Sequence, residues 1–232
     1  MIKKKSAYLI KIMAVACMCF TWISTCHAQN NVATKYGFRL GLTAHPTFGM
    51  ISAGEGNNRG TNLGFAYGVM ADFNVAEHYS FSTAVTITTI NGKSREINAM
   101  PYHMPVSIPN PMVYDLKYKM QYLEIPFMLK LKTSTVGQMK WFGQVGLSNG
   151  FKIRARQDAE NANGVLANEV NSSKWTRFYR AGLLIGGGAE FDLDGSTSLV
   201  TGLSFNNGLT TITTSENRVR NHYVALNLSV FF

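Results

Sequence analysis

Eight segments of the chain carry bulky apolar residues at every second position, and this pattern constrains the fold more than any other feature of the sequence. In 63–75, for example, Leu63, Phe65 and Tyr67 alternate with Gly64, Ala66 and Gly68. Successive side chains of a β-strand point to opposite faces, so each segment is predicted to be a strand with one bulky face and one small or polar face. The eight segments are 36–44, 63–75, 79–89, 122–132, 141–154, 179–193, 199–205 and 222–232.

The connections between these segments alternate strictly between long and short. The long connections are predicted at 45–62, 91–117, 155–174 and 208–220, and the short ones at 76–78, 133–139 and 194–196. Brief periplasmic turns and longer external loops are typical of outer-membrane barrels, and segments of about 9–11 residues suit tilted strands that cross a bilayer. The predicted fold is all-β, an eight-stranded antiparallel up-and-down transmembrane β-barrel. Pro126, which lacks a donor for the strand ladder, is expected to mark a local bulge.

A soluble lipocalin-like barrel is the alternative, because its strands also alternate with an apolar face that points inward. Eight strands enclose an interior barely wide enough for side chains, so the Phe, Trp, Tyr and Leu of the bulky faces would not fit inside. A content of 15% charged residues and a mean hydropathy of −0.02 also suit a membrane protein better than an ordinary globular domain. These considerations favour the membrane barrel.

The N-terminus has the three-part layout of a secretory signal peptide: Lys3, Lys4 and Lys5, an apolar stretch over 12–23, and a small residue at Ala28. We expect residues 1–28 to be cleaved and residues 29–232 to form the barrel domain in the outer membrane. All three cysteines precede position 28, so the mature chain would hold no disulfide or cysteine-based site. Without this segment, 18 basic residues face 13 acidic ones, and no basic stripe indicates a nucleic-acid partner.

Several segments together resemble the PorT-like family of small outer-membrane β-barrels of Bacteroidota. They are the Ala28-Gln29 exit, Tyr36 to Gly41, Tyr122 to Lys130, Asn206 to Leu209 and the final Phe232. The resemblance implies an eight-stranded barrel that serves as a structural or accessory component of the envelope. Some members of this family are required for type IX protein secretion, which implies other envelope or secretion proteins as partners.

The chain ends on a predicted strand with an aromatic residue, which resembles the assembly signal of bacterial outer-membrane barrels. The residues of this candidate signal are Leu228, Val230 and Phe232. The resemblance implies contact with the barrel-assembly machinery during insertion and with outer-membrane lipid afterwards.

Catalytic chemistry finds little support in the sequence. The four histidines after residue 28 are His45, His78, His103 and His222, and none occurs in a metal-ligand spacing. We expect no catalytic residue, no metal and no cofactor. A lipid-modifying enzyme is the least favoured alternative, and it would need a serine or acid beside His45 or His222 at a barrel rim.

Charged residues on the small faces of the strands are predicted to project into the lumen. Buried charges have to be paired, so a salt-bridged plug is favoured, and a small polar pore that admits a solute is the alternative. Segment 141–154 is expected to keep its parity throughout, which puts Lys152 and Arg154 on the inner face. The predicted lumen network comprises Arg39, Asp72, Glu124, Lys130, Lys132, Lys152, Arg154, Arg180, Glu190 and Asp192.

The long connection over 91–117 is the candidate for partner binding. It holds four of the six prolines together with methionines and tyrosines, which are adaptable or anchoring contact residues. A lid folded over the barrel mouth is the equally weighted alternative, since an apolar loop must bury its surface somewhere. The candidate contact residues are Pro101, Tyr102, Met104, Pro105, Ile108, Pro109, Pro111, Met112 and Tyr114.

Overall fold

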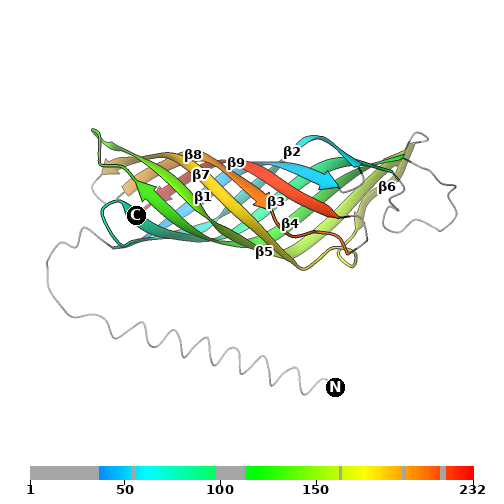
Figure 1. The fold of residues 1–232 in the computed structure, drawn as a ribbon, viewed down its shortest axis with the longest axis horizontal. Coiled ribbons are helices and arrows are strands. Elements are labelled where there is room, and N and C mark those ends of the chain that lie inside the picture. Colours follow the sequence, from blue (N-terminus) through cyan, green and yellow to red (C-terminus); the bar gives the residue numbers. More distant parts are fainter. Residues whose placement is uncertain (1–36, 54–55, 98–112, 162–163, 195–196, 215–217) are drawn as a thin grey trace, which may run out of the picture. The chain divides into compact units, whose positions relative to one another are not determined.

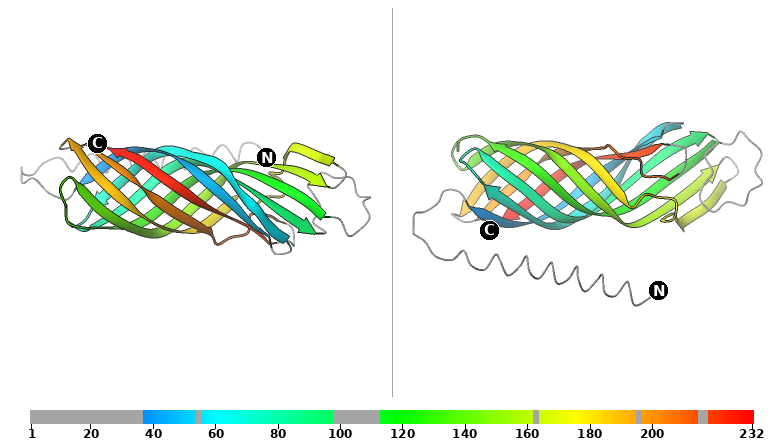
Figure 2. Two further views of the ribbon diagram at one scale, coloured as in Figure 1. Left: turned by 90° about the horizontal axis from the view of Figure 1, so that it is seen from above. Right: turned by 60° about the horizontal axis from the view of Figure 1, so that its bottom comes forward.

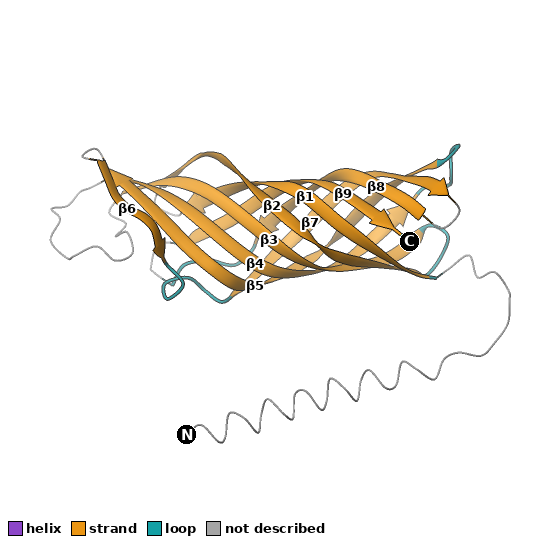
Figure 3. Ribbon diagram, turned by 180° about the vertical axis from the view of Figure 1, so that it is seen from behind, coloured by secondary structure: helices purple, strands orange, loops and turns teal. Residues whose placement is uncertain are grey.

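The computed structural model describes residues 37–53, 56–97, 113–161, 164–194, 197–214 and 218–232. Their regular elements are all strands (Figure 3). The predicted signal peptide lies outside these residues. No helix within the described ranges is long and apolar enough to span a bilayer. The strands are β1 (Phe38–Ala53), β2 (Gly56–Asn74), β3 (Tyr79–Ile97), β4 (Val113–Lys132), β5 (Met139–Asn161), β6 (Gly164–Asn171), β7 (Tyr179–Asp194), β8 (Thr197–Gly208) and β9 (Val219–Phe231).

Eight of these strands close into a barrel, which confirms the predicted fold class (Figure 1). Neighbours pair antiparallel in the order β4-β3-β2-β1-β9-β8-β7-β5, and the β4–β5 pairing closes the ring. Closure gives each wall strand a partner on both sides, which a bilayer demands because its hydrocarbon offers no hydrogen bonds. The ninth strand, β6, pairs among the described residues with the end of β5 alone and extends the wall at the long-loop end (Figure 2).

The chemistry of the two faces of the wall inverts along β3 and β4. Near the short turns, Phe81 and Phe127 point outward, while Ser82 and Lys130 are buried inside. Towards the long-loop end, the parity is unchanged, but the outward positions carry charge and the inward positions of β4 become apolar, while the last inward positions of β3 are the buried Ser94 and Glu96. The outward row of β4 runs Leu131, Leu129, Phe127, Ile125, Leu123, Gln121, Lys119, Lys117 and Asp115, and its upper inward positions are Met120, Tyr118, Leu116 and Tyr114.

This inversion marks the boundary between the part of the wall suited to lipid and the part suited to water. The outward apolar row of β4 runs from Leu131 to Leu123, about the length of a tilted strand that crosses a bilayer. Beyond Leu123, towards the long-loop end, the outer face of β4 is polar, and its inner side packs around a buried apolar core. The wall therefore continues past the lipid-facing band as an extension with a largely apolar interior, in which buried Glu96 accepts hydrogen bonds from Ser94 and Tyr118.

The extension corrects the predicted loop bounds. Most of 45–62 is strand, since β1 runs to Ala53 and β2 starts at Gly56. Likewise β3 continues to Ile97, β4 begins at Val113, and β5 and β6 occupy most of 155–174. The predicted strands were too short because they were assigned from a bulky outward face. That face ends at the lipid boundary, whereas the strands continue beyond it.

Two details of the wall differ from expectation. Pro126 causes no bulge, because β4 keeps its register with both neighbours across this residue, and the Pro126 carbonyl accepts a hydrogen bond from Thr83 Oγ1 at 2.8 Å. The bulge lies instead in β5: Tyr122 pairs with Lys152 and Gln121 with Arg154, which leaves Ile153 as the extra residue. Beyond it the parity of β5 flips, so Ala155 and Ala159 are buried and Arg154 points outward.

A charge scan along the outward row of β4 tests the lipid boundary. Phe127→Arg, in the middle of the apolar row, is expected to lower the free energy of unfolding by about 2–4 kcal/mol, and Gln121→Arg, above the boundary, by no more than about 1 kcal/mol. Equilibrium denaturant unfolding in phospholipid vesicles measures both. Equal costs at the two positions would show that the boundary is misplaced.

Candidate functional site

The lumen near the short turns is filled by a cluster of charged side chains, here called the turn-side ionic layer. Arg39 donates to Glu190 Oε1 at 2.6 Å and to Asp72 Oδ2 at 3.1 Å. Lys130 Nζ lies 3.1 Å from Asp72 Oδ2 and 3.5 Å from Glu190 Oε2. Lys132 Nζ lies 3.7 Å from Glu190 and donates to Asn74 Oδ1 at 3.0 Å, while Ser82 donates to Asp72.

Aromatic rings line this layer on its inner side. The Arg39 guanidinium lies 4.8 Å from the centroid of the Phe231 ring, and Lys130 Nζ lies 4.6 Å from that of Phe142. Cations over aromatic faces gain electrostatic stabilisation, which is larger where water is excluded. The inward-facing rings thus help to hold three cations against only two carboxylates.

A second cluster, the loop-side ionic layer, is centred on fully buried Arg180 of β7. Arg180 donates to Glu124 Oε1 at 3.0 Å, to Asn221 Oδ1 at 2.6 Å and to Asn206 Oδ1 at 2.8 Å. The second oxygen of Glu124 accepts from the Tyr223 hydroxyl at 2.8 Å. Both partners of this buried ion pair are therefore neutralised and hydrogen-bonded, as burial of charge requires.

A cavity of about 70 Å³ separates the two ionic layers. Its walls include Met70, Met128, Phe142, Leu184 and Val200. The volume suffices for a few water molecules. Beyond the loop-side layer, the lumen is filled by the apolar core that contains Ile90, Tyr118 and Met120. The described part of the lumen is thus a stack of two ionic layers and a largely apolar core, which also holds buried Glu96.

The mouth of the barrel is covered by residues 172–178 and 209–214, here called the mouth cap. Ile212 of the cap is buried in the apolar core, and Thr176 pairs with Thr213 across the two segments. Lys152 of β5 fastens the cap, since its Nζ donates to the carbonyls of Ser173 at 2.7 Å and Thr176 at 2.6 Å. Sequence reasoning did not identify this closure.

The structure brings seven residues of the predicted lumen network together in the two ionic layers. Arg39, Asp72, Lys130, Lys132 and Glu190 meet in one layer, and Glu124 and Arg180 meet in the other. Three residues of the prediction behave differently. Lys152 binds the cap rather than a carboxylate, and Asp192 is a half-exposed rim residue paired with Lys140 at 3.0 Å. Arg154 points outward, so its assignment to the lumen was wrong, because the bulge at Ile153 reverses the parity of β5.

The candidate partner loop is only partly described. Pro101, Tyr102, Met104, Pro105, Ile108, Pro109, Pro111 and Met112 lie outside the described residues. Tyr114 is a strand residue of β4 and is 5% exposed in the apolar core, so its assignment to the partner-binding loop was wrong. Its inward parity on a strand longer than predicted explains the error.

The proposed assembly signal lies on the last strand, β9, and its continuation. Leu228 and Phe232 are exposed on the outer face, and Val230 of the same row is partly exposed. Phe231, between them, is buried in the lumen instead. The role in assembly stays a prediction.

No histidine forms the arrangement that a lipid-modifying enzyme would need in the described part of the chain. His45 Nδ1 lies 3.1 Å from Thr43 Oγ1 on the cavity wall rather than at a rim. His222 Nδ1 accepts from the Gly208 amide at 3.2 Å. The described residues also contain no cluster of three or more potential metal ligands.

The outer face of the extension carries a dense set of charges on β3, β4, β5 and β6. Lys119 Nζ lies 2.9 Å from both Asp158 and Glu169, and Arg95 pairs with Asp115 at 2.7 Å. The hydrogen bond from Lys119 and the nearby charge of Arg156 hold the pKa of Glu169 below its ordinary value. These ion pairs are partly exposed, so each adds little to stability.

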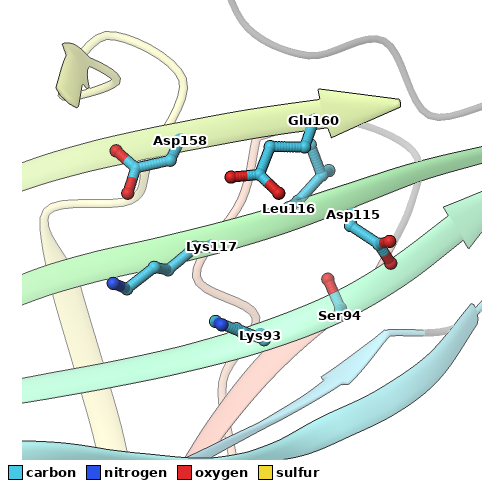
Figure 4. A pocket seen from close by; sticks show the side chains of 7 residues that line it. All are labelled: Lys93, Ser94, Asp115, Leu116, Lys117, Asp158 and Glu160. Atoms are coloured by element: carbon cyan, nitrogen blue, oxygen red, sulfur yellow. The ribbon is translucent and has the colours of Figure 1, made fainter. Parts of the chain in front are cut away.

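A polar pocket of about 290 Å³ opens among these charges (Figure 4). Lys93 and Lys117 lie directly opposite each other on β3 and β4, and Asp115 and Glu160 do so on β4 and β5. Like charges directly opposite each other destabilise a sheet. The pocket thus presents two lysines and three carboxylates, those of Asp115, Asp158 and Glu160, and its like-charge pairs destabilise the wall.

Breaking the loop-side ion pair tests its burial. Glu124→Leu leaves Arg180 buried without its counter-charge and is expected to lower the free energy of unfolding by about 3–5 kcal/mol. The double variant Glu124→Leu/Arg180→Met removes both charges and should lose clearly less. Denaturant unfolding in vesicles measures both variants; a double variant less stable than the single one would contradict the ion-pair arrangement.

The role of Lys152 is tested by hydrogen exchange in the mouth cap. In Lys152→Met, the amides of Trp175, Arg177 and Thr214 should exchange at least tenfold faster, because the cap loses the charge-assisted hydrogen bonds that join it to β5. Lys174→Met is the matched control, since Lys174 is an exposed cap residue with no such contact. Unchanged exchange in Lys152→Met would contradict the anchoring role of Lys152.

The comparison with models of protein families agrees with this architecture. The model of the outer membrane protein beta-barrel domain family matches residues 27–214. Neisserial surface protein A is 15% identical, with 83% of this chain and 97% of that chain covered and a TM-score of 0.44. OprG from Pseudomonas aeruginosa is 9% identical over 84% and 95% of the two chains, with a TM-score of 0.47. No curated protein matches the chain. The chain belongs to the outer membrane protein beta-barrel domain family and is located in the outer membrane.

Proposed function

We propose that this protein is a closed, non-enzymatic barrel that anchors a charged sheet extension at the outer surface of the outer membrane, as an accessory component of an envelope assembly. The observation that carries the proposal is the contrast between the two ends of the wall. The lumen is occupied by two paired ionic layers and an apolar core, whereas the extension holds charged groups in excess of what its own stability uses.

The charges that line the pocket on the extension favour a protein as the partner. Lys93 and Lys117 have no ion-pair partner among the described residues, although each faces the other across neighbouring strands. A partner segment that brings carboxylates to these lysines, and a cation to Glu160, would relieve both like-charge contacts. Complementary charges of this kind give an interface specificity and speed its formation.

The resemblance to PorT-like barrels suggests type IX protein secretion as the assembly. In this proposal, residues 91–117 contribute both the ends of β3 and β4 and the segment between them that contains the prolines. Contact with the barrel-assembly machinery would precede this role, through the terminal row Leu228, Val230 and Phe232.

A small-solute pore or ligand-binding barrel is the second candidate. The cavity of about 70 Å³ between the ionic layers favours it, because a small molecule or a few waters could reside there. The ionic layers on both sides of this cavity count against it, since passage would require two buried salt-bridge clusters to separate.

A deletion strain tests the secretion role. Loss of this gene is expected to remove the type IX cargo from the secreted and surface proteomes, and the full-length gene should restore it. A chain that lacks 99–111 should not restore it, although it keeps Val113 and Tyr114 and therefore the start of β4 and the apolar core.

Two controls make this experiment decisive. Heat-modifiable gel migration shows that the shortened barrel is folded and inserted. Lys140→Gln, which removes a charge at the opposite rim, should restore secretion like the wild type. Unchanged cargo in the deletion strain would contradict the secretion role and leave an envelope barrel with another partner.

A further inference from the structure

A groove of about 400 Å³ lies on the outer wall where the β1–β2 hairpin extends past the end of β8. Met50 of β1, Phe205 of β8 and His222 of β9 contribute to it, together with Asn57 of β2 and Asn207 of β8. About 300–1,000 Å³ is the usual size of a small-ligand pocket. The groove differs in composition from the charged pocket on β3–β5, because no charged residue is among its described lining.

The groove crosses the boundary between the lipid-facing band and the polar extension. On β8 the outward row changes from Phe205 to Asn207, and on β9 it changes from Val224 to His222. On β1 the same change occurs between Met50 and Ser52. An occupant that satisfies both parts must be amphipathic, and the groove continues the surface that the bilayer already covers. These features favour a lipid of the outer leaflet as the occupant of the groove.

The polar part of the groove favours a hydroxylated headgroup over a phosphate. Asparagine side chains offer both a donor and an acceptor, as a sugar hydroxyl does, whereas a phosphate only accepts and binds most strongly to cations, which the described lining of the groove lacks. His222 adds one donor, because its Nδ1 accepts from the Gly208 amide and its Nε2 therefore carries the proton. We propose that this groove binds the sugar headgroup of an outer-leaflet glycolipid, with Met50 and Phe205 against the start of its acyl chains.

Native mass spectrometry of the purified full chain in detergent tests this proposal. The probes are a monogalactosyl diacylglycerol, a phosphatidic acid and a phosphatidylcholine with the same acyl chains, offered as an equimolar mixture. One galactolipid per barrel is the expected result, bound in at least tenfold preference to the other two. Equal binding of phosphatidic acid, or of all three lipids, would overturn the proposal.

Variants locate the bound lipid. Asn207→Leu/His222→Leu removes hydrogen-bonding groups and should weaken galactolipid binding about tenfold. His222→Gln keeps an N–H donor and should retain most of the binding. Gln121→Leu is the matched control, because Gln121 is an outward amide just above the apolar row of β4, which lies across the ring from β9.

Heat-modifiable migration confirms that each variant is folded before binding is compared. Binding by the double variant equal to that of the wild type would place the lipid elsewhere on the wall. This inference does not depend on the proposed secretion role, since it concerns the β1–β2–β8–β9 side and is measured on the isolated protein.

Discussion

The requirement that governs this structure is an apolar outer surface around the whole circumference of the lipid-facing band. In a wall of strands, alternate side chains face inward, so the polar and charged residues excluded from lipid must enter the lumen. Eight strands leave room there for side chains and little else. Each buried charge then needs a partner, and Arg39, Asp72, Lys130 and Glu190 in one layer and Arg180 and Glu124 in the other meet this need.

The same strands meet the opposite requirement once they leave the bilayer. Water on the outside favours charge there, and the inward positions can close around an apolar core, as Leu116, Tyr118 and Met120 do on β4. The protein thus has a membrane barrel and a water-exposed sheet built on one continuous set of strands. The surfaces available for recognition follow from this arrangement: a charged pocket on the extension, and a neutral groove at the boundary itself.

Period-two alternation was sufficient to predict the closed eight-stranded barrel and seven of the charges that meet in the lumen. The pattern failed where the strands pass from lipid into water. Beyond that boundary they lack a bulky outward row, so these parts of the strands were predicted as loops. Arg154 was assigned to the wrong face because β5 contains one extra residue, Ile153. No side-chain pattern in the sequence indicates this bulge. The roles of Asn206, Asn221 and Tyr223 depend on which strands become neighbours. Tyr223 lies within a predicted strand, whereas Asn206 and Asn221 lie just outside the predicted strands, so the convergence of the three on Arg180 could not be predicted.

Ion conductance across a planar lipid bilayer tests the central claim that this lumen is closed. The purified chain, shown to be folded by heat-modifiable migration, is expected to insert without producing conductance steps above the lipid baseline, because two ionic layers and an apolar core block the lumen. Stable, reproducible steps from folded wild-type barrels would contradict this claim and would make a solute pore the better explanation of the fold.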